Sequence, residues 1–268
     1  MKRSPRALIL LLVLMLGASA CDNQAGPQLD ANRPAKNEDG VVSKSAEPAA
    51  KETPEKKVEA AKTPADKLAE RVIAASGDPE SLSRLEFSFV PRRDGEEVSR
   101  RHHNWQPKAG EVTITAGEKD YRLTHLRDYD LTKLSAEPDQ HAEAWEAIAP
   151  DLTPEEAAKA WGWFINDSYW LLVPSKLMDE GVNRQLDDQG RLVLTFGEVG
   201  LTPGDRYVLT VDPETHRVTR WEFKLQGGNE GDFAWSDYQQ VGPLTLSGVR
   251  SAKDSEMAIT FDNLRAQP

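Results

Sequence analysis

The sequence predicts an α+β domain in which one large curved antiparallel sheet is covered on its apolar face by a few helices. Two observations carry this prediction. Apolar and polar residues alternate with a period of two through much of residues 85–123 and 192–261. This alternation is typical of antiparallel strands with one buried face and one solvent-exposed face. Residues 154–172 instead repeat apolar side chains at helical spacing, and we expect this helix to cover the sheet.

The N-terminus has the pattern of a secretory signal. Three positive charges in residues 1–6 precede an unbroken apolar run of ten residues, 7–16. That run is too short to cross a hydrocarbon core, which needs about 20 residues. Small residues follow it as far as Ala20. We therefore expect residues 1–20 to be a signal peptide that is removed.

The single cysteine of the chain, Cys21, follows those small residues directly. The run ASAC at residues 18–21 resembles the bacterial lipobox, whose cysteine is acylated and becomes the new N-terminus. Two or more acyl chains anchor a protein stably to a membrane. Asp22 resembles an enterobacterial signal for inner-membrane retention, which favours the periplasmic face of that membrane slightly over the outer membrane. The alternative is an ordinary signal peptide that has a cysteine here by chance.

Residues 21–64 are predicted to be a disordered tether. Residues 22–64 contain five prolines and no aromatic residue, so they cannot bury enough apolar surface to offset the entropy of ordering them. A plain spacer is favoured over a peptidoglycan-binding role for its Lys/Glu tract.

The aromatic residues indicate where the folded domain lies. All seven tryptophans and all five tyrosines lie in residues 65–268, which we expect to form one domain. The signal contributes +3 and the tether −1 to the net charge of −11, which leaves −13 on this domain. Such a charge argues against nucleic acid as a partner, because that binding depends on clustered basic residues.

The domain is expected to begin with a helix over residues 65–76 that Gly77 ends. A short turn capped by residues 78–80 follows, and the period of two starts after it. Residues 94–95, Asp-Gly, are a hairpin signal. The strands predicted for this part cover residues 85–89, 96–106, 112–114 and 121–123.

The middle of the domain is predicted to be helical. One helix covers residues 142–148, and a second begins at Thr153 with a proline at its first position and a glutamate that completes a capping box. Pro174 ends the second helix. Strands return in the C-terminal third, over residues 192–196, 207–211, 219–225, 233–235, 244–246 and 257–261.

Two parts of the chain resemble a known family. Residues 166–182, NDSYWLLVPSKLMDEGV, are similar to a run in bacterial envelope proteins of the lipoprotein-carrier superfamily. The order of residues 207–212, 218–223, 235–238 and 259–264 is similar to that in outer-membrane lipoprotein-sorting proteins of the LolA/LolB type. The resemblance covers about residues 65–268. Unlike the soluble carrier of that family, this chain is predicted to have its own anchor and tether.

This resemblance implies an open half-barrel whose concave apolar side is covered by helices and holds acyl chains. It therefore implies a hydrophobic ligand site in this chain, lined from both the helix and the sheet. The residues assigned to the site are Trp161, Phe164, Ile165, Phe196, Trp221, Phe223 and Trp235. The alternative for the tryptophans around residues 161–170 is ordinary core packing.

The sequence predicts no catalytic residue, no metal site and no cofactor. It contains no G-x-S-x-G, H-E-x-x-H or P-loop motif, and its one cysteine is expected to be acylated. His102 and His103 are neighbours on a predicted strand, so they point to opposite faces and cannot share one metal ion. Four aspartates lack the complete spacing of a calcium loop and are interpreted as turn residues: Asp128, Asp130, Asp187 and Asp188.

The leading hypothesis is a non-enzymatic, membrane-anchored lipoprotein of the cell envelope that binds an acyl or lipid ligand, or a lipidated partner. One alternative is an interaction or sensing module, which would present an exposed apolar sheet edge or patch. Another is a hydrolase, which would need an acid/base set with perturbed pKa values inside the concavity.

Overall fold

The structure, a computed structural model, describes residues 61–196 and 204–268. The predicted signal peptide, the acylated Cys21, Asp22 and nearly all of the predicted tether lie outside these residues, and they stay predictions. None of the helices within the described ranges is long and apolar enough to span a membrane.

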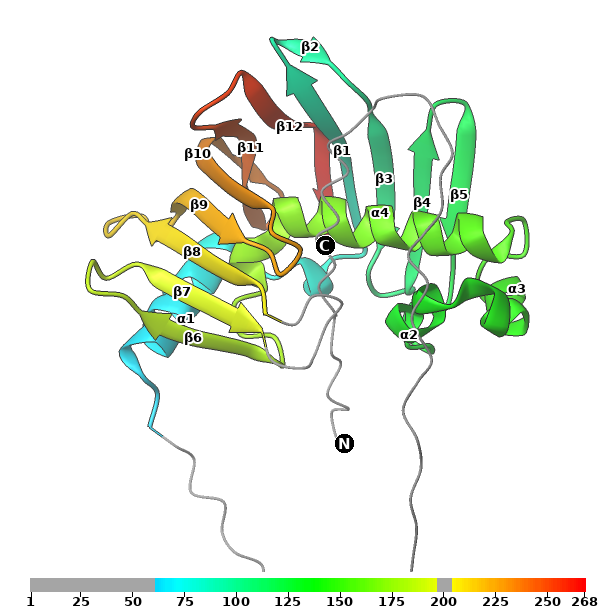
Figure 1. The fold of residues 1–268 in the computed structure, drawn as a ribbon, viewed down its shortest axis with the longest axis horizontal. Coiled ribbons are helices and arrows are strands. Elements are labelled where there is room, and N and C mark those ends of the chain that lie inside the picture. The colour runs from blue at the N-terminus through cyan, green and yellow to red at the C-terminus, as the bar shows by residue number, and fades with distance from the viewer. Residues whose placement is uncertain (1–60, 197–203) are drawn as a thin grey trace, which may run out of the picture. The chain divides into compact units, whose positions relative to one another are not determined.

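One sheet of twelve strands forms the framework, and Figure 1 shows it as an open sheet. Its strands are β1 (Arg84–Arg93), β2 (Glu96–Glu97), β3 (Arg101–Gln106), β4 (Glu111–Ala116), β5 (Lys119–Leu123), β6 (Val182–Leu186), β7 (Leu192–Phe196), β8 (Arg206–Val211), β9 (Val218–Lys224), β10 (Glu230–Val241), β11 (Leu244–Ala252) and β12 (Met257–Gln267). They follow the order β5-β4-β3-β1-β12-β11-β10-β9-β8-β7-β6, and β2 pairs with β1 outside this path. Because β1 pairs with β12, the first and last strands of the domain meet inside the sheet.

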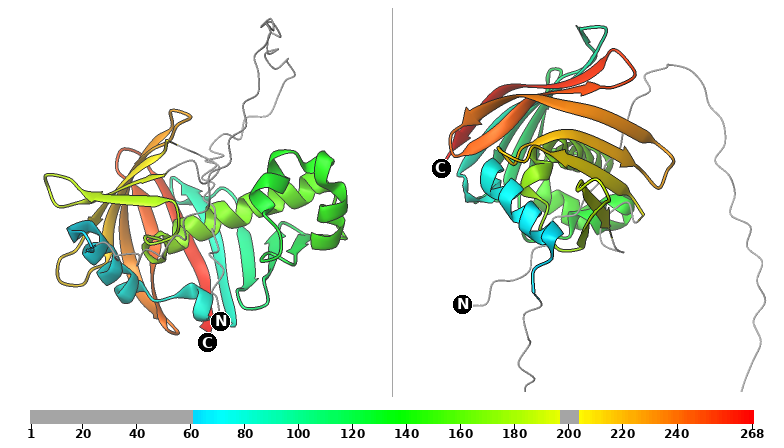
Figure 2. Two further views of the ribbon diagram at one scale, coloured as in Figure 1. Left: turned by 90° about the horizontal axis from the view of Figure 1, so that it is seen from below. Right: turned by 90° about the vertical axis from the view of Figure 1, so that its left-hand side faces the viewer.

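Helices cover one side of this sheet. They are α1 (Pro64–Ser76), α2 (Leu131–Ala136), α3 (Ala142–Ile148) and α4 (Pro154–Leu172), with single 3-10 turns η1 (Pro79–Ser81), η2 (Pro138–His141) and η3 (Val173–Ser175). Figure 2 shows the sheet curving around α4, and α1 packs beside β6 and β7. The predicted fold class, a large curved antiparallel sheet covered by a few helices, is confirmed.

The sequence explains where α4 begins and ends. The Thr153 hydroxyl accepts a hydrogen bond from the backbone N–H of Glu156, and the Glu156 carboxylate accepts one from the N–H of Thr153, which is the predicted capping box. The α-helix ends at Leu172, two residues before Pro174. Its first half is amphipathic, as predicted. Residues 164–172, however, are all buried, because this half of α4 lies inside the curve of the sheet.

The structure corrects one predicted element and adds one strand and one helix, besides the 3-10 turns η2 and η3. The prediction of a single strand over residues 96–106 is wrong. Strand β2 pairs with β1 at only two residues, the chain then leaves the sheet, and it pairs with β1 again only from Arg101 of β3. In the gap, the backbone N–H of Val98 donates to the carbonyl oxygen of Pro91 over 2.9 Å. Strand β6 and helix α2 were not predicted; both are short, and neither repeats apolar residues over a long window.

Candidate functional site

The residues predicted to line a ligand site lie on the concave side of the sheet, in two groups. All but Phe196 are buried in the hydrophobic core, so the structure packs them as the core-packing alternative expects. The first group surrounds the middle of α4. Trp161 and Phe164 have ring centroids 5.8 Å apart, and Trp105 of β3 approaches Phe164 edge-on at 5.5 Å. Ile165 is buried in the same core.

The second group lies where the end of α4 meets β9 and β10. Trp221 contacts Trp235 at 6.2 Å and Phe223 at 5.2 Å, and Trp170 of α4 packs edge-on against Trp221 at 4.7 Å. The seventh predicted residue, Phe196 of β7, is only half-buried and belongs to this end of the sheet. Trp170 joins this group because every side of the second half of α4 is enclosed.

Residues that were not predicted connect the two groups. His103 of β3 lies 6.2 Å from Phe164 and stacks on Phe87 at 4.6 Å, and Phe87 contacts Phe261 of β12 at 6.1 Å. The guanidinium of Arg250 then lies 4.5 Å from the ring centre of Phe261 and 4.0 Å from that of Trp235. Phe87 and Phe261 follow the period of two in their strands, so the sequence carried the signal that places them on this face.

A buried carboxylate fastens α4 to β3. Asp167 is fully buried, and its Oδ2 accepts hydrogen bonds from Arg101 Nε over 2.6 Å and from His103 Nε2 over 2.8 Å. Its Oδ1 accepts from Arg101 Nη2 over 2.7 Å and from Asn166 Nδ2 over 2.8 Å. The guanidinium of Arg101 also lies over the rings of Phe89 and Trp163. We call Asp167, Arg101 and His103 the Asp167 clamp.

The protonation states in the Asp167 clamp follow from burial and from these hydrogen bonds. Burial raises the pKa of Asp167, but the hydrogen bonds from Arg101 and His103 outweigh it and hold that pKa below its usual value, so the group is a carboxylate. Burial lowers the pKa of His103, against the opposing effect of Asp167, so the imidazole is neutral at pH 7. Its Nε2 then carries the proton that is donated to Asp167.

The hydrolase alternative requires an acid/base set that a substrate can reach. The Asp167 clamp contains a His–Asp pair, but that pair is buried. His103 is fully buried with its ring against Phe87, and its Nδ1 contacts no hydrogen-bond partner among the described residues. Hydrolysis by a His–Asp pair needs an accessible nucleophile, such as a side-chain hydroxyl, a thiol or a water molecule, within hydrogen-bond reach of the imidazole. The arrangement therefore does not favour a hydrolase over a structural clamp.

The interior of the described chain also holds unpartnered donors. The buried indole N–H groups of four tryptophans, Trp145, Trp161, Trp221 and Trp235, and the Nε–H of Arg250 have no hydrogen-bond partner there. Buried donors in proteins are nearly always satisfied by protein, water or a ligand. Three of these tryptophans were assigned to the ligand site from the sequence, although their missing partners could not be predicted from it.

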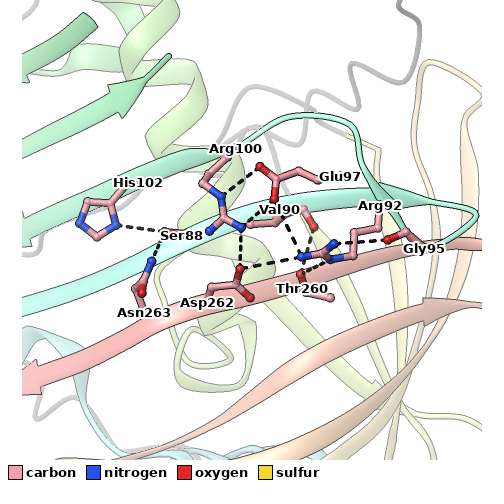
Figure 3. A network of polar contacts seen from close by, with 10 residues as sticks. All are labelled: Ser88, Val90, Arg92, Gly95, Glu97, Arg100, His102, Thr260, Asp262 and Asn263. Carbon is pink, nitrogen blue, oxygen red and sulfur yellow. Dashed lines mark hydrogen bonds and ion pairs between the residues drawn. The ribbon is translucent and has the colours of Figure 1, made fainter. Parts of the chain in front are cut away.

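The convex face carries a second polar network, drawn in Figure 3. Ser88 Oγ and His102 Nδ1 are 3.0 Å apart, and Asn263 Nδ2 donates to Ser88 Oγ over 3.2 Å. Arg100 donates to Glu97 and, over 2.8 Å, to Asp262. The serine is fully buried, so this Ser–His pair presents no accessible nucleophile. The network joins β1, β3 and β12, and it confirms that His102 and His103 face opposite ways.

Three of the aspartates interpreted as turn residues, Asp128, Asp187 and Asp188, lie in or directly beside turns, whereas Asp130 precedes the first residue of α2. The Asp130 carboxylate caps α2, and that of Asp187 accepts from the backbone N–H groups of Gln189 and Arg191, both over 2.9 Å. The part of the chain that the structure describes brings together no group of three or more His, Cys, Asp or Glu side chains that could hold a metal ion.

The exposed apolar residues do not favour the interaction-module alternative. Four large apolar side chains are exposed in residues 61–196 and 204–268: Val98, Tyr129, Met178 and Leu186. They come from separate segments of the chain, and single exposed apolar side chains are ordinary features of a protein surface. The concave side, with its aromatic groups and unpartnered donors, is therefore the candidate functional site.

Comparison with known proteins gives similarities of fold. No protein-family model and no curated protein sequence matches the chain. Among solved structures, the LolA superfamily protein NE2245 from Nitrosomonas europaea is 9% identical with a TM-score of 0.42, covering 76% of this chain and 94% of its own. A putative outer membrane lipoprotein-sorting protein domain from Vibrio parahaemolyticus is 11% identical with a TM-score of 0.35, covering 75% and 91%.

A DUF1329 family protein from Desulfovibrio piger is 12% identical with a TM-score of 0.37, covering 75% of this chain and 90% of its own. At such identities the likeness concerns the fold, and no residue role is transferred from these proteins.

Proposed function

We propose that this protein is a non-enzymatic lipoprotein of the bacterial cell envelope that binds an acyl or lipid ligand, or the lipid of a lipidated partner, between α4 and the concave side of the sheet. Acylated Cys21 anchors it to a membrane, and the tether holds the domain away from the membrane surface. The ligand contacts the residues assigned to the site, among them Trp161, Trp221 and Trp235.

The observation that carries this proposal is the set of unpartnered tryptophan N–H groups in an interior made of aromatic rings. A completed core satisfies its buried donors, because each unsatisfied one costs about 1–3 kcal/mol. Three of these N–H groups belong to Trp161, Trp221 and Trp235 in the candidate site. Small-molecule sites in proteins are lined mainly by aromatic and apolar side chains, with a few polar groups that orient the ligand.

The test measures contact between an acyl chain and these rings. The full-length chain, purified in detergent, is titrated with acyl chains that carry bromine, offered both as a fatty acid and as its methyl ester, because bromine quenches the fluorescence of a tryptophan that it touches. We expect saturable quenching at one ligand per chain. Trp221→Phe should lower the amount of fluorescence that the ligand quenches, whereas Trp163→Phe, which removes a half-buried ring outside the assigned site, should leave that amount unchanged.

Absence of saturable quenching by both the acid and the ester would contradict ligand binding. The anchor is checked on the same preparation by the mass of the N-terminal peptide. An acylated Cys21 at the new N-terminus supports the anchor, and an unmodified cysteine contradicts it.

A further inference from the structure

Arg250 is a fully buried cation on the concave side of the sheet. It lies on β11 directly opposite Trp235 of β10, so both side chains face α4. One Nη donates to the backbone carbonyl of Ser247, and the other donates over 3.4 Å to that of Leu171, at the end of α4. The flat guanidinium is stacked between the rings of Trp235 and Phe261.

No carboxylate neutralises this charge. Arg250 forms no ion pair with any residue of the described ranges, although other arginines there, such as Arg101 and Arg220, pair with aspartates. Burial lowers the pKa of Arg250 to about 9, so the guanidinium remains charged at neutral pH. An isolated buried charge is expensive, and proteins normally pair such charges or hydrogen-bond them completely.

Two tryptophan rings on this side of the sheet, beside Arg250, also carry unpartnered donors. Arg250 Nε has no acceptor, and neither has the indole N–H of Trp235, whose ring the guanidinium covers at 4.0 Å. The N–H of Trp221, whose ring contacts that of Trp235 at 6.2 Å, is also unpartnered. All three groups donate and none can accept. An acceptor with one negative charge would satisfy what this part of the interior lacks.

We infer that Arg250, together with the indole N–H groups of Trp221 and Trp235, binds the singly charged anionic head of an acyl ligand. This inference rests on the proposed function and specifies its ligand class. The shared chemistry is one negatively charged oxygen acceptor on a hydrocarbon chain, which both the carboxylate of a fatty acid and the phosphodiester of a lysophospholipid provide. A head bound at the unpartnered Nε would leave both backbone hydrogen bonds of Arg250 in place.

The aromatic rings near Arg250 favour an anionic head that is attached to a hydrocarbon chain. Trp170 lies 4.7 Å from Trp221 and 4.9 Å from Phe233, and Phe223 stacks on Phe233 at 6.1 Å. A hydrocarbon chain attached to the head would lie against these rings, whereas a small hydrated anion would lose its water there without gaining apolar contacts. An amphiphile therefore fits this place better than a free inorganic anion does.

The experiment compares three competitors of the brominated probe on the full-length chain at pH 7.5: stearic acid, methyl stearate and stearoyl lysophosphatidylglycerol. A hydrogen bond to a charged group stabilises a complex enough to change affinity roughly 10- to 100-fold. We expect stearic acid or the lysophospholipid to bind at least about tenfold more tightly than the uncharged ester. The tighter of the two anions identifies the source of the head group.

Variants locate the effect. Arg250→Met should bring the anions down to the affinity of methyl stearate and leave the ester unchanged. Arg220→Met is the matched control, because Arg220 lies on β9, on the other side of β10 from β11, and pairs with Asp232 at the surface. It should keep the preference for an anion.

The outcomes separate the two proposals. If acid, ester and lysophospholipid bind equally to the wild-type chain, the head-group inference is wrong and the proposed function stands. This comparison needs no variant, so it holds even if Arg250→Met fails to fold. If none of the three displaces the probe and the probe itself does not bind, the proposed function is wrong as well.

Discussion

Two charges are buried on the concave side of the same sheet, and their surroundings differ. Asp167, near the middle of α4, accepts four hydrogen bonds, and Arg101 neutralises its charge. Arg250, on β11 near the end of α4, contacts two carbonyl groups and two rings but no carboxylate among the described residues. Removing one partner of a paired buried charge is costly, so we expect Asp167 to serve the fold, whereas we propose that a ligand supplies the acceptor that Arg250 Nε lacks.

The largest effect expected from this difference concerns Asp167. Asp167→Asn removes the negative charge but keeps the size of the side chain, so Arg101 loses its counter-charge beneath α4. Breaking a buried pair in this way costs about 3–5 kcal/mol. We expect a loss at the lower end of that range, measured as the free energy of unfolding in urea, because the Arg101 side chain is 17% exposed.

The matched control is Asp262→Asn on the convex face. Asp262 makes the same kind of contact with Arg100, but both side chains are 36% exposed, and surface pairs stabilise by about 0–1 kcal/mol. If the two variants lose the same stability, the Asp167 clamp stabilises the fold no more than a surface ion pair does.

A smaller effect is expected from pH, through the neutral His103. Folding holds the pKa of this imidazole below its unfolded value of 6.5, so below that pH the unfolded chain binds a proton that the folded chain does not. Stability should therefore fall as the pH drops below about 6.5, by up to about 1.4 kcal/mol per pH unit. The contribution of Asp167 is present above its unfolded pKa of 3.8 and is lost only below it, so the two effects occur in separate ranges.

Urea unfolding at pH 7.5, 6 and 5 measures this effect. His103→Gln, which keeps a donor but cannot titrate, should flatten the dependence between pH 6.5 and 5. His102→Gln, on the opposite face of β3, should retain the wild-type fall. An unchanged slope in His103→Gln would show that other groups cause the acid sensitivity.

The smallest change in stability is expected at Arg250. Arg250→Met removes an unneutralised buried charge, which favours the fold, but it also leaves the carbonyl groups of Ser247 and Leu171 without this donor, which opposes that gain. We expect the free energy of unfolding to stay within about 1 kcal/mol of the wild type or to rise. A loss as large as that of Asp167→Asn would mean that the charge of Arg250 serves the fold, and the contrast between the two sites would be lost.

Local sequence signals were sufficient for most elements of the fold. The alternation in strands such as β9 is local, because successive side chains of a strand point to opposite faces whatever the partner. The capping box at Thr153 is local too, since it needs only four consecutive residues. Where pairing with a distant strand decides the element, as in the break between β2 and β3, the local pattern predicted one strand and was wrong.

The sequence by itself determined that α4 and the strands would place Trp161, Trp221 and Trp235 on apolar faces, because periodicity fixes the side on which a residue lies. Only the tertiary structure decided that Asp167 meets Arg101 across 66 residues of sequence, and that Arg250 meets no carboxylate at all in the described chain. The physical reason is that the energy of a charge depends on its neighbours in space and on the water excluded around it. Neither of these is a local property of the chain.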